Sequence, residues 1–144
     1  MKTRGLDDVR CINIFDERLT EQYDTILMLM NGIGIARTLN ELPHLFSRLS
    51  RLMTRDSQVL VDSSDLRYIF EDEEGNLDFD IEDGYYGEVD YTMIYKNVKG
   101  EPFDWLYIDF DTLKTIAGGC GLDCQLIANG SNYDYLAKIT KQHK

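Results

Sequence analysis

Two short apolar runs with an amphipathic segment between them constrain the fold of this chain most strongly. The first run, Tyr23–Met30, is predominantly apolar and ends at Asn31-Gly32, which is typical of a strand that is buried on both faces. A second run of this kind covers Gln58–Asp62. Strand, helix and strand at this spacing form a βαβ unit with parallel strands and a right-handed crossover. We therefore expect an α/β protein with a mostly parallel sheet and helices on its faces.

The segment between the two runs has the clearest helical periodicity in the chain. Asn40 is expected to cap this helix, and Pro43 is tolerated in its first turn. Arg48 and Arg51 fall on the side opposite the apolar residues, so both are predicted to face solvent. The apolar residues that recur at helical spacing are Leu42, Leu45, Phe46, Leu49, Leu52 and Met53.

The middle of the chain has a different period. Apolar and polar residues alternate over 77–82 and 89–96, and another apolar run covers 103–108. A period of two predicts antiparallel strands, with one face of each strand turned to solvent. We therefore expect an acidic, aromatic β-hairpin insertion over 68–108, inside a single domain of residues 1–144.

After the insertion the pattern is again that of an α/β protein. Asp109 or Asp111 can cap a helix that ends at the glycines from Gly118 to Gly121. Strands are predicted at 125–128 and 135–139. Asn129-Gly130 between them favours a tight hairpin turn, although a longer loop reaching Tyr133 fits the sequence equally well.

Charge and cysteine content exclude several classes of protein. The formal net charge is −11, and residues 71–90 hold ten acidic side chains and no Lys or Arg. Such a field disfavours general nucleic-acid binding, which depends on neutralising phosphates. Three cysteines do not make a disulfide framework or a zinc signature, so we expect no metal site and a cytoplasmic protein. No apolar stretch is long enough to span a membrane, and the N-terminus does not read as a signal peptide.

The order of these elements resembles the C-terminal part of a Rossmann-like S-adenosylmethionine-dependent methyltransferase, from its third strand onward. The resemblance rests on Tyr23-Asp24 through Asn31-Gly32-Ile33-Gly34, the following helix, Val59–Asp62, and Gly121-Leu122 before two closing strands. It implies that Val9–Phe15 is the family's third strand and Tyr23–Met30 its fourth. The family's G-x-G-x-G turn and the acidic residue closing its second strand have no counterpart here. We therefore expect an N-terminally truncated domain that lacks the cofactor-binding first half.

The resemblance implies S-adenosylmethionine as the cofactor and indicates which residues contact it. Where the family has an Asp that accepts from the adenine amino group, this chain has Asn13, whose carbonyl oxygen can do the same. Phe15 either packs against adenine or is a core aromatic. Asn31 either lies near the methyl donor or serves only as turn backbone. The full set of expected cofactor contacts is Asn13, Ile14, Phe15, Met30, Asn31 and Gly32.

The acceptor is expected beyond the carboxyl ends of the parallel strands, where open α/β sheets bind their ligands. Tyr85 and Tyr86, beside Gly84 and Gly87, are candidates for a lid, although tyrosines of this region also suit the packing of a sheet face. No catalytic base can be named from the sequence. The expected acceptor contacts are Asp62, Asp65, Tyr68, Tyr85 and Tyr86.

Two functions of different classes follow from these observations. The first is methyl transfer to an unknown acceptor by the intact parent enzyme, with this chain alone inactive. The alternative is a non-catalytic interaction module. In that case the chain homodimerises through an exposed sheet edge, or by exchange of Val9–Phe15, because an open apolar edge pairs readily with another chain.

Overall fold

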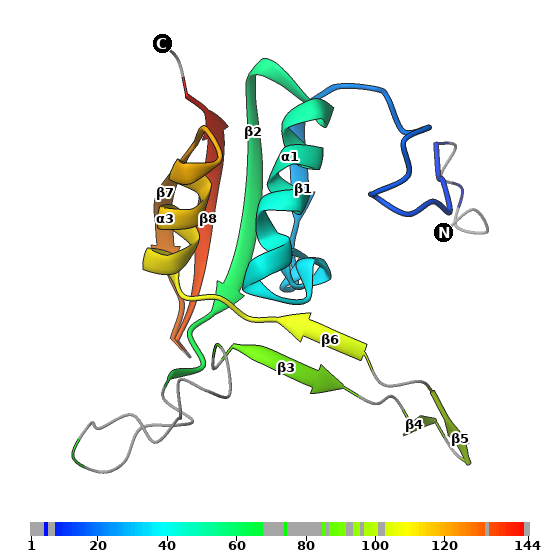
Figure 1. Ribbon diagram of the computed structural model, residues 1–144, viewed down its shortest axis with the longest axis vertical. Helices are drawn as coiled ribbons and strands as arrows, with labels where there is room; N and C mark the ends of the chain where they lie inside the picture. The colour runs from blue at the N-terminus through cyan, green and yellow to red at the C-terminus, as the bar shows by residue number, and fades with distance from the viewer. Residues whose placement is uncertain are drawn as a thin grey trace.

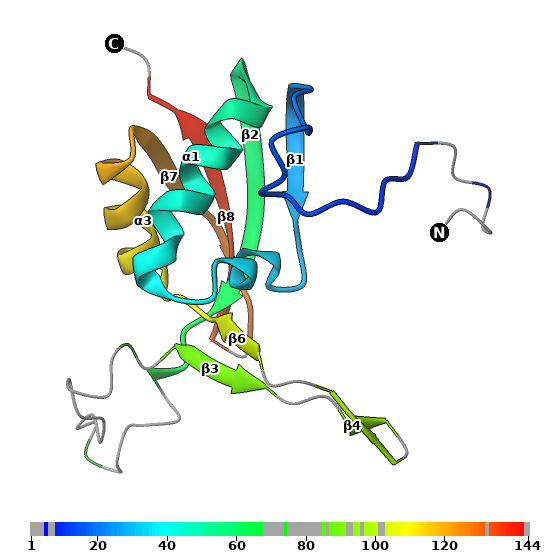
Figure 2. The ribbon, with the colours of Figure 1, turned by 45° about the vertical axis from the view of Figure 1, so that its right-hand side comes forward.

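The fold is built on a four-stranded sheet with two helices on one of its faces, as the computed structural model shows (Figures 1 and 2). The helices are α1 (Leu42–Leu52) and α3 (Phe110–Gly119). The strands are β1 (Tyr23–Met28), β2 (Met53–Ser64), β7 (Leu122–Asn129) and β8 (Asp134–Lys141). The structure describes residues 5, 8–67, 74, 85, 87–91, 94–95, 97–100, 103–131 and 133–142.

The sheet has the strand order β1-β2-β8-β7. β1 and β2 are parallel and are joined through α1, which confirms the βαβ unit. β8 is antiparallel to β2, and β7 is antiparallel to β8, so the chain closes with an antiparallel hairpin. The carboxyl ends of β1 and β2 therefore lie at the same end of the sheet.

β1 differs from its sequence-based prediction. The strand was expected to be buried on both faces, but most of its residues are exposed, and the side chain of Leu27 is 61% accessible. The reason is its position, because β1 ends the sheet and no described strand pairs with its outer side. The helices cover one face of the sheet (Figure 2). Ile26 and Met28 pack against the core, so Leu27 between them points to the other side of β1.

The prediction of a strand at Val9–Phe15 is wrong. In the structure this segment turns instead, with the Asp16 N–H donating to the Asn13 carbonyl at 2.9 Å and the Phe15 N–H donating to Asn13 Oδ1 at 2.9 Å. A short polar side chain that bonds its own backbone offers the chain an alternative to a ladder. The segment lies beside α1 and β1 and adds nothing to the sheet (Figure 1).

The amphipathic helix forms as predicted, but two of its details differ. Its predicted apolar residues are buried, whereas Arg48, predicted to face solvent, is only 7% accessible. Asn40 is not its cap. The side chain of Thr38 accepts from the Glu41 N–H and caps the 3-10 helix η3 (Leu39–Glu41), which leads directly into α1. Pro43 lies in the first turn of α1, where its missing N–H costs nothing.

The second helix settles the alternatives that the sequence left open at this end of the chain. Asp109, rather than Asp111, is the cap of α3, and its side chain accepts from the Thr112 N–H at 3.0 Å. Gly121 follows the helix with a φ of +80°, a conformation that favours glycine. β7 and β8 are joined by the longer loop, which reaches Tyr133.

The predicted insertion contains antiparallel strands, as expected. β3 (Glu88–Tyr91) pairs with β6 (Phe103–Leu106), and β4 (Ile94–Tyr95) pairs with β5 (Val98–Lys99). These strands form an arm that projects from the carboxyl end of β2 (Figure 1). The predicted alternation over 77–82 lies outside the described residues. Within the described part of the chain, no helix combines the length and apolar character that crossing a membrane requires.

Candidate functional site

Asn31 stands at the centre of a buried hydrogen-bond network where β1 and β2 end. Its backbone is left-handed, with φ 57° and ψ 37°, and its side chain is 9% accessible. The side-chain Nδ2 donates to the Leu106 carbonyl at 3.0 Å, and Oδ1 accepts from the Ser63 hydroxyl at 2.6 Å. The Asn31 N–H donates to Asp62 Oδ1 at 3.2 Å. Asn31 thus ties the end of β1 both to β2 and to β6.

Ser63 continues this network to Ile108, in the connection between β6 and α3, and from there to β8. Its hydroxyl accepts from the Ile108 N–H at 3.0 Å while it donates to Asn31. The Ile108 carbonyl in turn accepts from the Tyr135 hydroxyl at 2.5 Å. Burial raises the pKa of Tyr135 far above its usual range, so this hydroxyl remains a donor at all ordinary pH values.

Gly34 lets the indole ring of Trp105 pack directly against the backbone. A Cβ placed on Gly34 would lie 2.0 Å from Trp105 Nε1, so only glycine fits under this ring. The same Nε1 donates to the Asn31 carbonyl at 3.1 Å. Gly34 belongs to the 3-10 helix η2 (Gly32–Ala36), which directly follows the end of β1. The arm is therefore attached at two points of the same loop.

Tyr85 and Asp109 form a second attachment at the base of the arm. The Tyr85 hydroxyl donates to Asp109 Oδ1 and accepts from the Asp109 N–H at 3.0 Å. Burial raises the pKa of Asp109, but the hydrogen bonds from Thr112 and Tyr85 outweigh it, and the net shift lowers this pKa. Asp109 therefore stays ionised while it caps α3.

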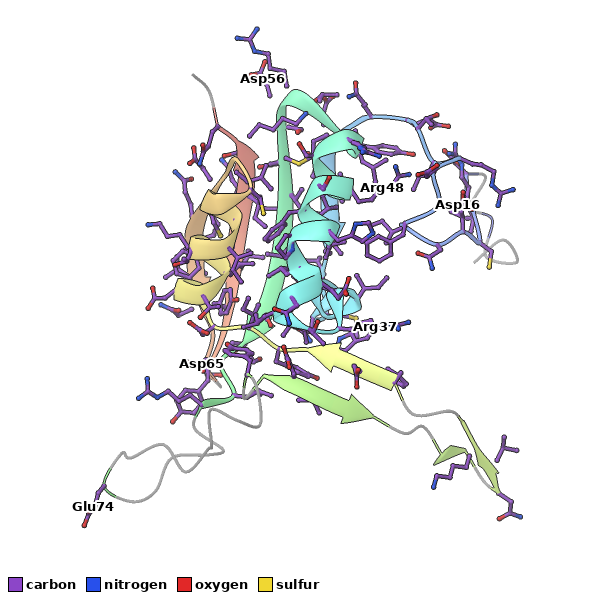
Figure 3. The ribbon with its side chains drawn as sticks, in the orientation of Figure 1. Asp16, Arg37, Arg48, Asp56, Asp65 and Glu74 are labelled. Atoms are coloured by element: carbon purple, nitrogen blue, oxygen red, sulfur yellow. The ribbon has the colours of Figure 1, made fainter. Side chains whose placement is uncertain are left out.

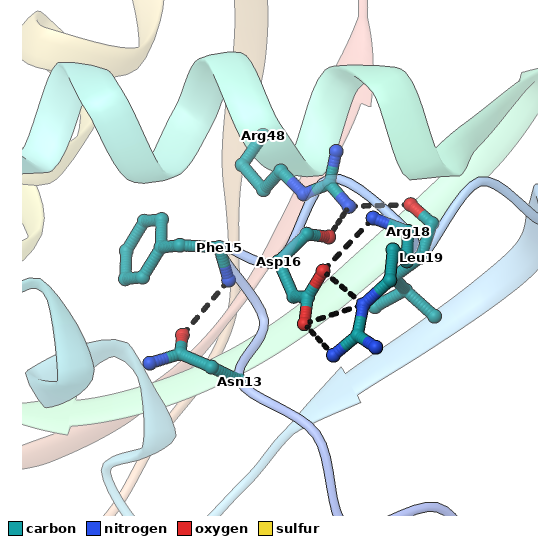
Figure 4. Close-up of polar contacts among 6 residues, drawn as sticks. All are labelled: Asn13, Phe15, Asp16, Arg18, Leu19 and Arg48. Atoms are coloured by element: carbon teal, nitrogen blue, oxygen red, sulfur yellow. Dashed lines mark hydrogen bonds and ion pairs between the residues drawn. The ribbon is translucent and has the colours of Figure 1, made fainter.

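The segment Asn13–Leu19, here called the docked segment, lies against α1 (Figure 4). Arg48 Nε donates to the Ile14 carbonyl at 2.8 Å, and its terminal nitrogen donates to the carbonyls of Asp16 and Leu19. The rings of Phe15 and His44 stack with their centroids 4.9 Å apart and their planes 8° apart. Figure 3 shows Arg48 on the side of α1 that faces Asp16.

A cavity of about 520 Å³ opens between the docked segment, η2, α1 and the arm. Its volume lies within the range of small-molecule pockets. Charged side chains of both signs, an aromatic ring and backbone line it together. The lining residues are Asn13, Phe15, Ile35, Ala36, Arg37, Thr38, Glu41, His44 and Asp104.

The structure brings only part of the expected cofactor set together. Asn13 and Phe15 line the cavity, and Ile14 beside them is half-buried. The Asn31 side chain is directed into the buried network and does not line the cavity. Gly32 donates its N–H to the Leu29 carbonyl at 3.1 Å, and Met30 is 92% accessible with a φ of 56°.

The described residues that were expected to contact the methyl acceptor do not lie together in one site. Asp62 accepts from the Asn31 N–H, whereas Asp65 lines a separate groove of about 640 Å³. That groove also contains Asp109, the partner of Tyr85, and the loop around Tyr133. Tyr68 and Tyr86 lie outside the described residues. In the described part of the chain, no group of three or more His, Cys, Asp or Glu side chains is arranged to hold a metal ion.

Sequence reasoning missed the residues that hold this region together. Ser63 and Tyr135 lie in strands, and no local pattern distinguishes them from other strand residues. The contact between Trp105 and Gly34 joins residues 71 positions apart in the sequence, so no local pattern predicts it. Arg48 lies in an amphipathic helix, on the side opposite its apolar residues, and this position predicted exposure to solvent. In the structure Arg48 is buried.

No protein-family model matches this chain, and no curated protein matches it. Solved structures do. A SAM-dependent methyltransferase from Bacteroides fragilis, in complex with S-adenosyl-L-homocysteine, is 50% identical with a TM-score of 0.90. The match covers 98% of this chain and 57% of that one, so the chain spans little more than half of its relative's length.

Two more distant structures share the fold. A S-adenosylmethionine-dependent methyltransferase from Clostridium acetobutylicum has a TM-score of 0.64 at 8% identity, with 99% of this chain and 68% of that chain covered. The sugar N-methyltransferase KedS8 from Streptoalloteichus has a TM-score of 0.60 at 13% identity, with 98% and 66% covered. This chain therefore carries part of the Rossmann-like fold of S-adenosylmethionine-dependent methyltransferases.

Proposed function

We propose that this chain is a functional part of an S-adenosylmethionine-dependent methyltransferase, and that it supplies one wall of the cofactor site and the base of the acceptor site. The observation that carries the proposal is the 50% identity, over 98% of this chain, to a methyltransferase crystallised with S-adenosyl-L-homocysteine. Identity at this level over nearly the whole chain supports more than a shared fold. The acceptor stays open, because fold likeness alone does not define a substrate.

The residues that line the cavity fit the adenosine end of the cofactor. Asn13 Oδ1 accepts one hydrogen bond, from the Phe15 N–H, and its second lone pair can accept from the adenine amino group. Phe15 is held parallel to His44 and offers an aromatic edge beside that position. When bound, the cofactor would supply a methyl group activated on a sulfonium. The protein would then contribute binding, orientation and exclusion of water.

The acceptor side is supported by the arrangement at the carboxyl ends of the strands. Asp65 and the Tyr85–Asp109 pair lie at the base of the arm, where a loop insertion can shape a pocket for the acceptor. Asp109 is ionised and is already occupied by Thr112 and Tyr85, so its role is to fix Tyr85 rather than to accept a proton. No catalytic base is assigned among the described residues.

Titration of the isotope-labelled chain with S-adenosyl-L-homocysteine, followed by NMR, tests the proposal. We expect saturable shifts at Asn13 and Phe15, with the far end of β7 unchanged. Affinity should be weak, because this chain spans only 57% of its relative. An Asn13→Leu variant should lose the shifts, whereas Asn40→Leu, on the exposed surface, should keep them. Absence of any saturable shift contradicts the cofactor site, and micromolar affinity by calorimetry contradicts an incomplete site.

The open edge of β1 supports a second candidate function, self-association. The outer side of β1 has no partner strand in the described structure, and the exposed fractions of Leu27, Leu29 and Met30 are 61%, 47% and 92%. An apolar edge of this kind can continue its sheet into a second copy of the chain. The chain would then act as a homodimeric interaction module.

Light scattering over a range of concentrations tests self-association. We expect a mass of twice 16.7 kDa for the native chain and a monomer for Leu27→Lys, since a lysine at an edge opposes pairing. Val98→Lys is the matched control, because Val98 is also an exposed apolar strand residue, at 70%, but lies on the arm. A monomeric native chain at every concentration contradicts this candidate function.

A further inference from the structure

Arg48 of α1 donates hydrogen bonds to three carbonyls of the docked segment. We propose that Arg48 is a positioning residue that holds Asn13–Leu19 against α1 and thereby sets the wall of the cavity formed by Asn13 and Phe15. The proposal deepens the cofactor site argued above and rests on it for its functional meaning. The geometric part of the proposal concerns the segment itself and can be tested without any ligand.

Three carbonyls of the docked segment converge on one guanidinium, and Figure 4 shows two of them, those of Asp16 and Leu19. Arg48 Nε donates to Ile14 at 2.8 Å, and a terminal nitrogen donates to Asp16 and to Leu19. The carbonyls can converge because the segment makes two successive turns. In these turns the Asp16 N–H donates to the Asn13 carbonyl at 2.9 Å, and the Leu19 N–H donates to the Asp16 carbonyl at 3.1 Å.

The charge of Arg48 is compensated by backbone dipoles rather than by an ion pair. Arg48 is 7% accessible and forms no salt bridge with a described carboxylate. Asp16, an acid of the segment, pairs with Arg18 at 2.7 Å. A buried cation needs its hydrogen bonds satisfied, and the planar fork of arginine can reach several carbonyls at once. This side chain is therefore specifically matched to the segment.

His44, one helical turn before Arg48, makes the second contact with the docked segment. Phe15 lies between the carbonyls of Ile14 and Asp16 that Arg48 holds, and its ring stacks on His44. Asn13, Phe15 and His44 all line the cavity. Arg48 thus places the backbone on either side of Phe15, and the stack on His44 orients the ring that forms the cavity wall.

The docked segment contributes little to the core, which separates positioning from general stability. Ile14 and Phe15 only pack against the outside of the buried cluster formed by the helices and the sheet. Release of the segment should leave the α1–β2–β8 core intact. The effect of losing Arg48 should therefore be local, and this is what the test must detect.

The test compares Arg48→Met and Arg48→Lys with Arg51→Met, an exposed position on the same helix. Methionine replaces the apolar stem of arginine, lacks the guanidinium, and has a similar helix propensity. His44 provides the signature. The chain has only two histidines, and a ring stacked on Phe15 should have its proton resonances shifted upfield. We expect Arg48→Met to lose this shift, Arg48→Lys to restore part of it, and Arg51→Met to keep it.

Amide hydrogen exchange gives the second readout. The N–H groups of Phe15, Asp16, Arg18 and Leu19 are hydrogen-bonded within the docked segment. In Arg48→Met we expect them to exchange at least about tenfold faster, while β2 and β8 keep their protection. An unchanged His44 shift, or faster exchange spread evenly over the chain, overturns the proposal.

Titration with S-adenosyl-L-homocysteine then separates this proposal from the proposed function. From the titration of the Asn13 shifts, we expect Arg48→Met to bind the ligand about tenfold more weakly, or weaker still, than the native chain. Retained affinity in a variant whose segment is released overturns the positioning role. If the native chain shows no response to the ligand but Arg48→Met still releases the segment, the cofactor site is refuted and the anchoring by Arg48 is supported.

Discussion

Two loops of this protein are attached to the same framework in different ways. The arm strand β6 is held by a buried network in which Asn31 and Ser63 both donate and accept, and the Leu106 and Ile108 backbone completes the bonds. The docked segment is held through its carbonyls by the single side chain of Arg48 and by one ring stack. The first attachment is part of the core, and the second is added to its outside.

This difference predicts how each region responds to change. In the buried network, removal of one side chain leaves its partners unsatisfied without access to water, and each such group costs about 1–3 kcal/mol. In the docked segment, carbonyls that lose Arg48 can form hydrogen bonds with water instead. The segment should therefore lose its ordered position while the free energy of unfolding of the whole chain changes little. The arm should therefore fail together with the core, whereas the docked segment should fail alone.

The largest effect is expected for Asn31→Leu. The substitution removes the acceptor of the buried Ser63 hydroxyl and the Asn31 donor to the Leu106 carbonyl, and it places leucine in a left-handed conformation. Together these changes should lower the free energy of unfolding by about 3–4 kcal/mol, measured by urea denaturation. Asn31→Asp keeps an acceptor for Ser63, so its free energy of unfolding should lie between those of the native chain and Asn31→Leu. Asn40→Leu, at an exposed position, should change this free energy little. A loss below that of Arg48→Met would refute the contrast between the two attachments.

A smaller loss is expected for Gly34→Ala. The new Cβ would lie 2.0 Å from Trp105 Nε1, so the indole must move, and overpacking of this kind costs about 1–3 kcal/mol. Trp105 is the single tryptophan, so its fluorescence emission should shift to longer wavelength as the ring becomes more exposed. Gly118→Ala is the matched control. Nothing lies near that position in α3, and the change should stabilise the helix by up to about 1 kcal/mol. Unchanged emission in Gly34→Ala would mean that Trp105 does not anchor the arm.

Acid should act on the Asp16–Arg18 pair of the docked segment and not on the bonds that join the Asn31 side chain to Ser63 and Leu106. The hydrogen bonds from the Arg18 side chain and from the Arg18 N–H lower the pKa of Asp16 to about 2. Because this pKa lies below the ordinary value of 3.8, the contribution of Asp16 is complete above that pH and is lost as the pH falls toward 2. The bonds among Asn31, Ser63 and Leu106 involve no titratable group.

Carbon-detected NMR of the Asp16 carboxyl group measures this titration directly. Arg18→Gln should return the midpoint toward 3.8, while the side-chain amide resonances of Asn31, which is bonded through that amide to Leu106 and Ser63, stay unchanged over the same range. A midpoint near 3.8 in the native chain would show that the Asp16–Arg18 pair does not order the segment in solution.

Thiol reactivity should show the smallest and simplest difference between the two regions. Cys11 is exposed next to the docked segment, whereas Cys124 in β7 is buried. Burial raises the pKa of the Cys124 thiol from 9.0 to about 11, which lowers its thiolate fraction near neutral pH by about a hundredfold. Alkylation followed by mass spectrometry should modify Cys11 first and Cys124 only on unfolding. Equal rates in the native protein would indicate that α3 does not protect β7.

Elements with a strong local pattern could be predicted from the sequence alone. The apolar stripe of α1 and the strand at Gln58–Asp62 each depend on residues within a few positions of one another, and each is confirmed. The sequence also limited the cap of α3 to Asp109 or Asp111, and the structure selects Asp109. Errors occurred where distant partners decide the outcome. Val9–Phe15 has the composition of a strand, but Asn13 bonds its own backbone and Arg48 takes up the carbonyls.

The candidate site divides in the same way. Asn13, Phe15 and Asn31 were identified by resemblance, yet only Asn13 and Phe15 line the cavity, because the Asn31 side chain satisfies Ser63 and Leu106 instead. Such a choice between partners depends on groups that are far away along the chain, and no local pattern contains it.

The sequence by itself determined the α/β class, the βαβ unit and the amphipathic helix, because hydrophobic periodicity acts within each element. Only the tertiary structure decided that β1 is an open edge, that Arg48 is buried, and that Asn31 belongs to the core network. The physical reason is that burial and hydrogen-bond satisfaction are properties of contacts between elements. Their free energy is set only when segments tens of residues apart come together.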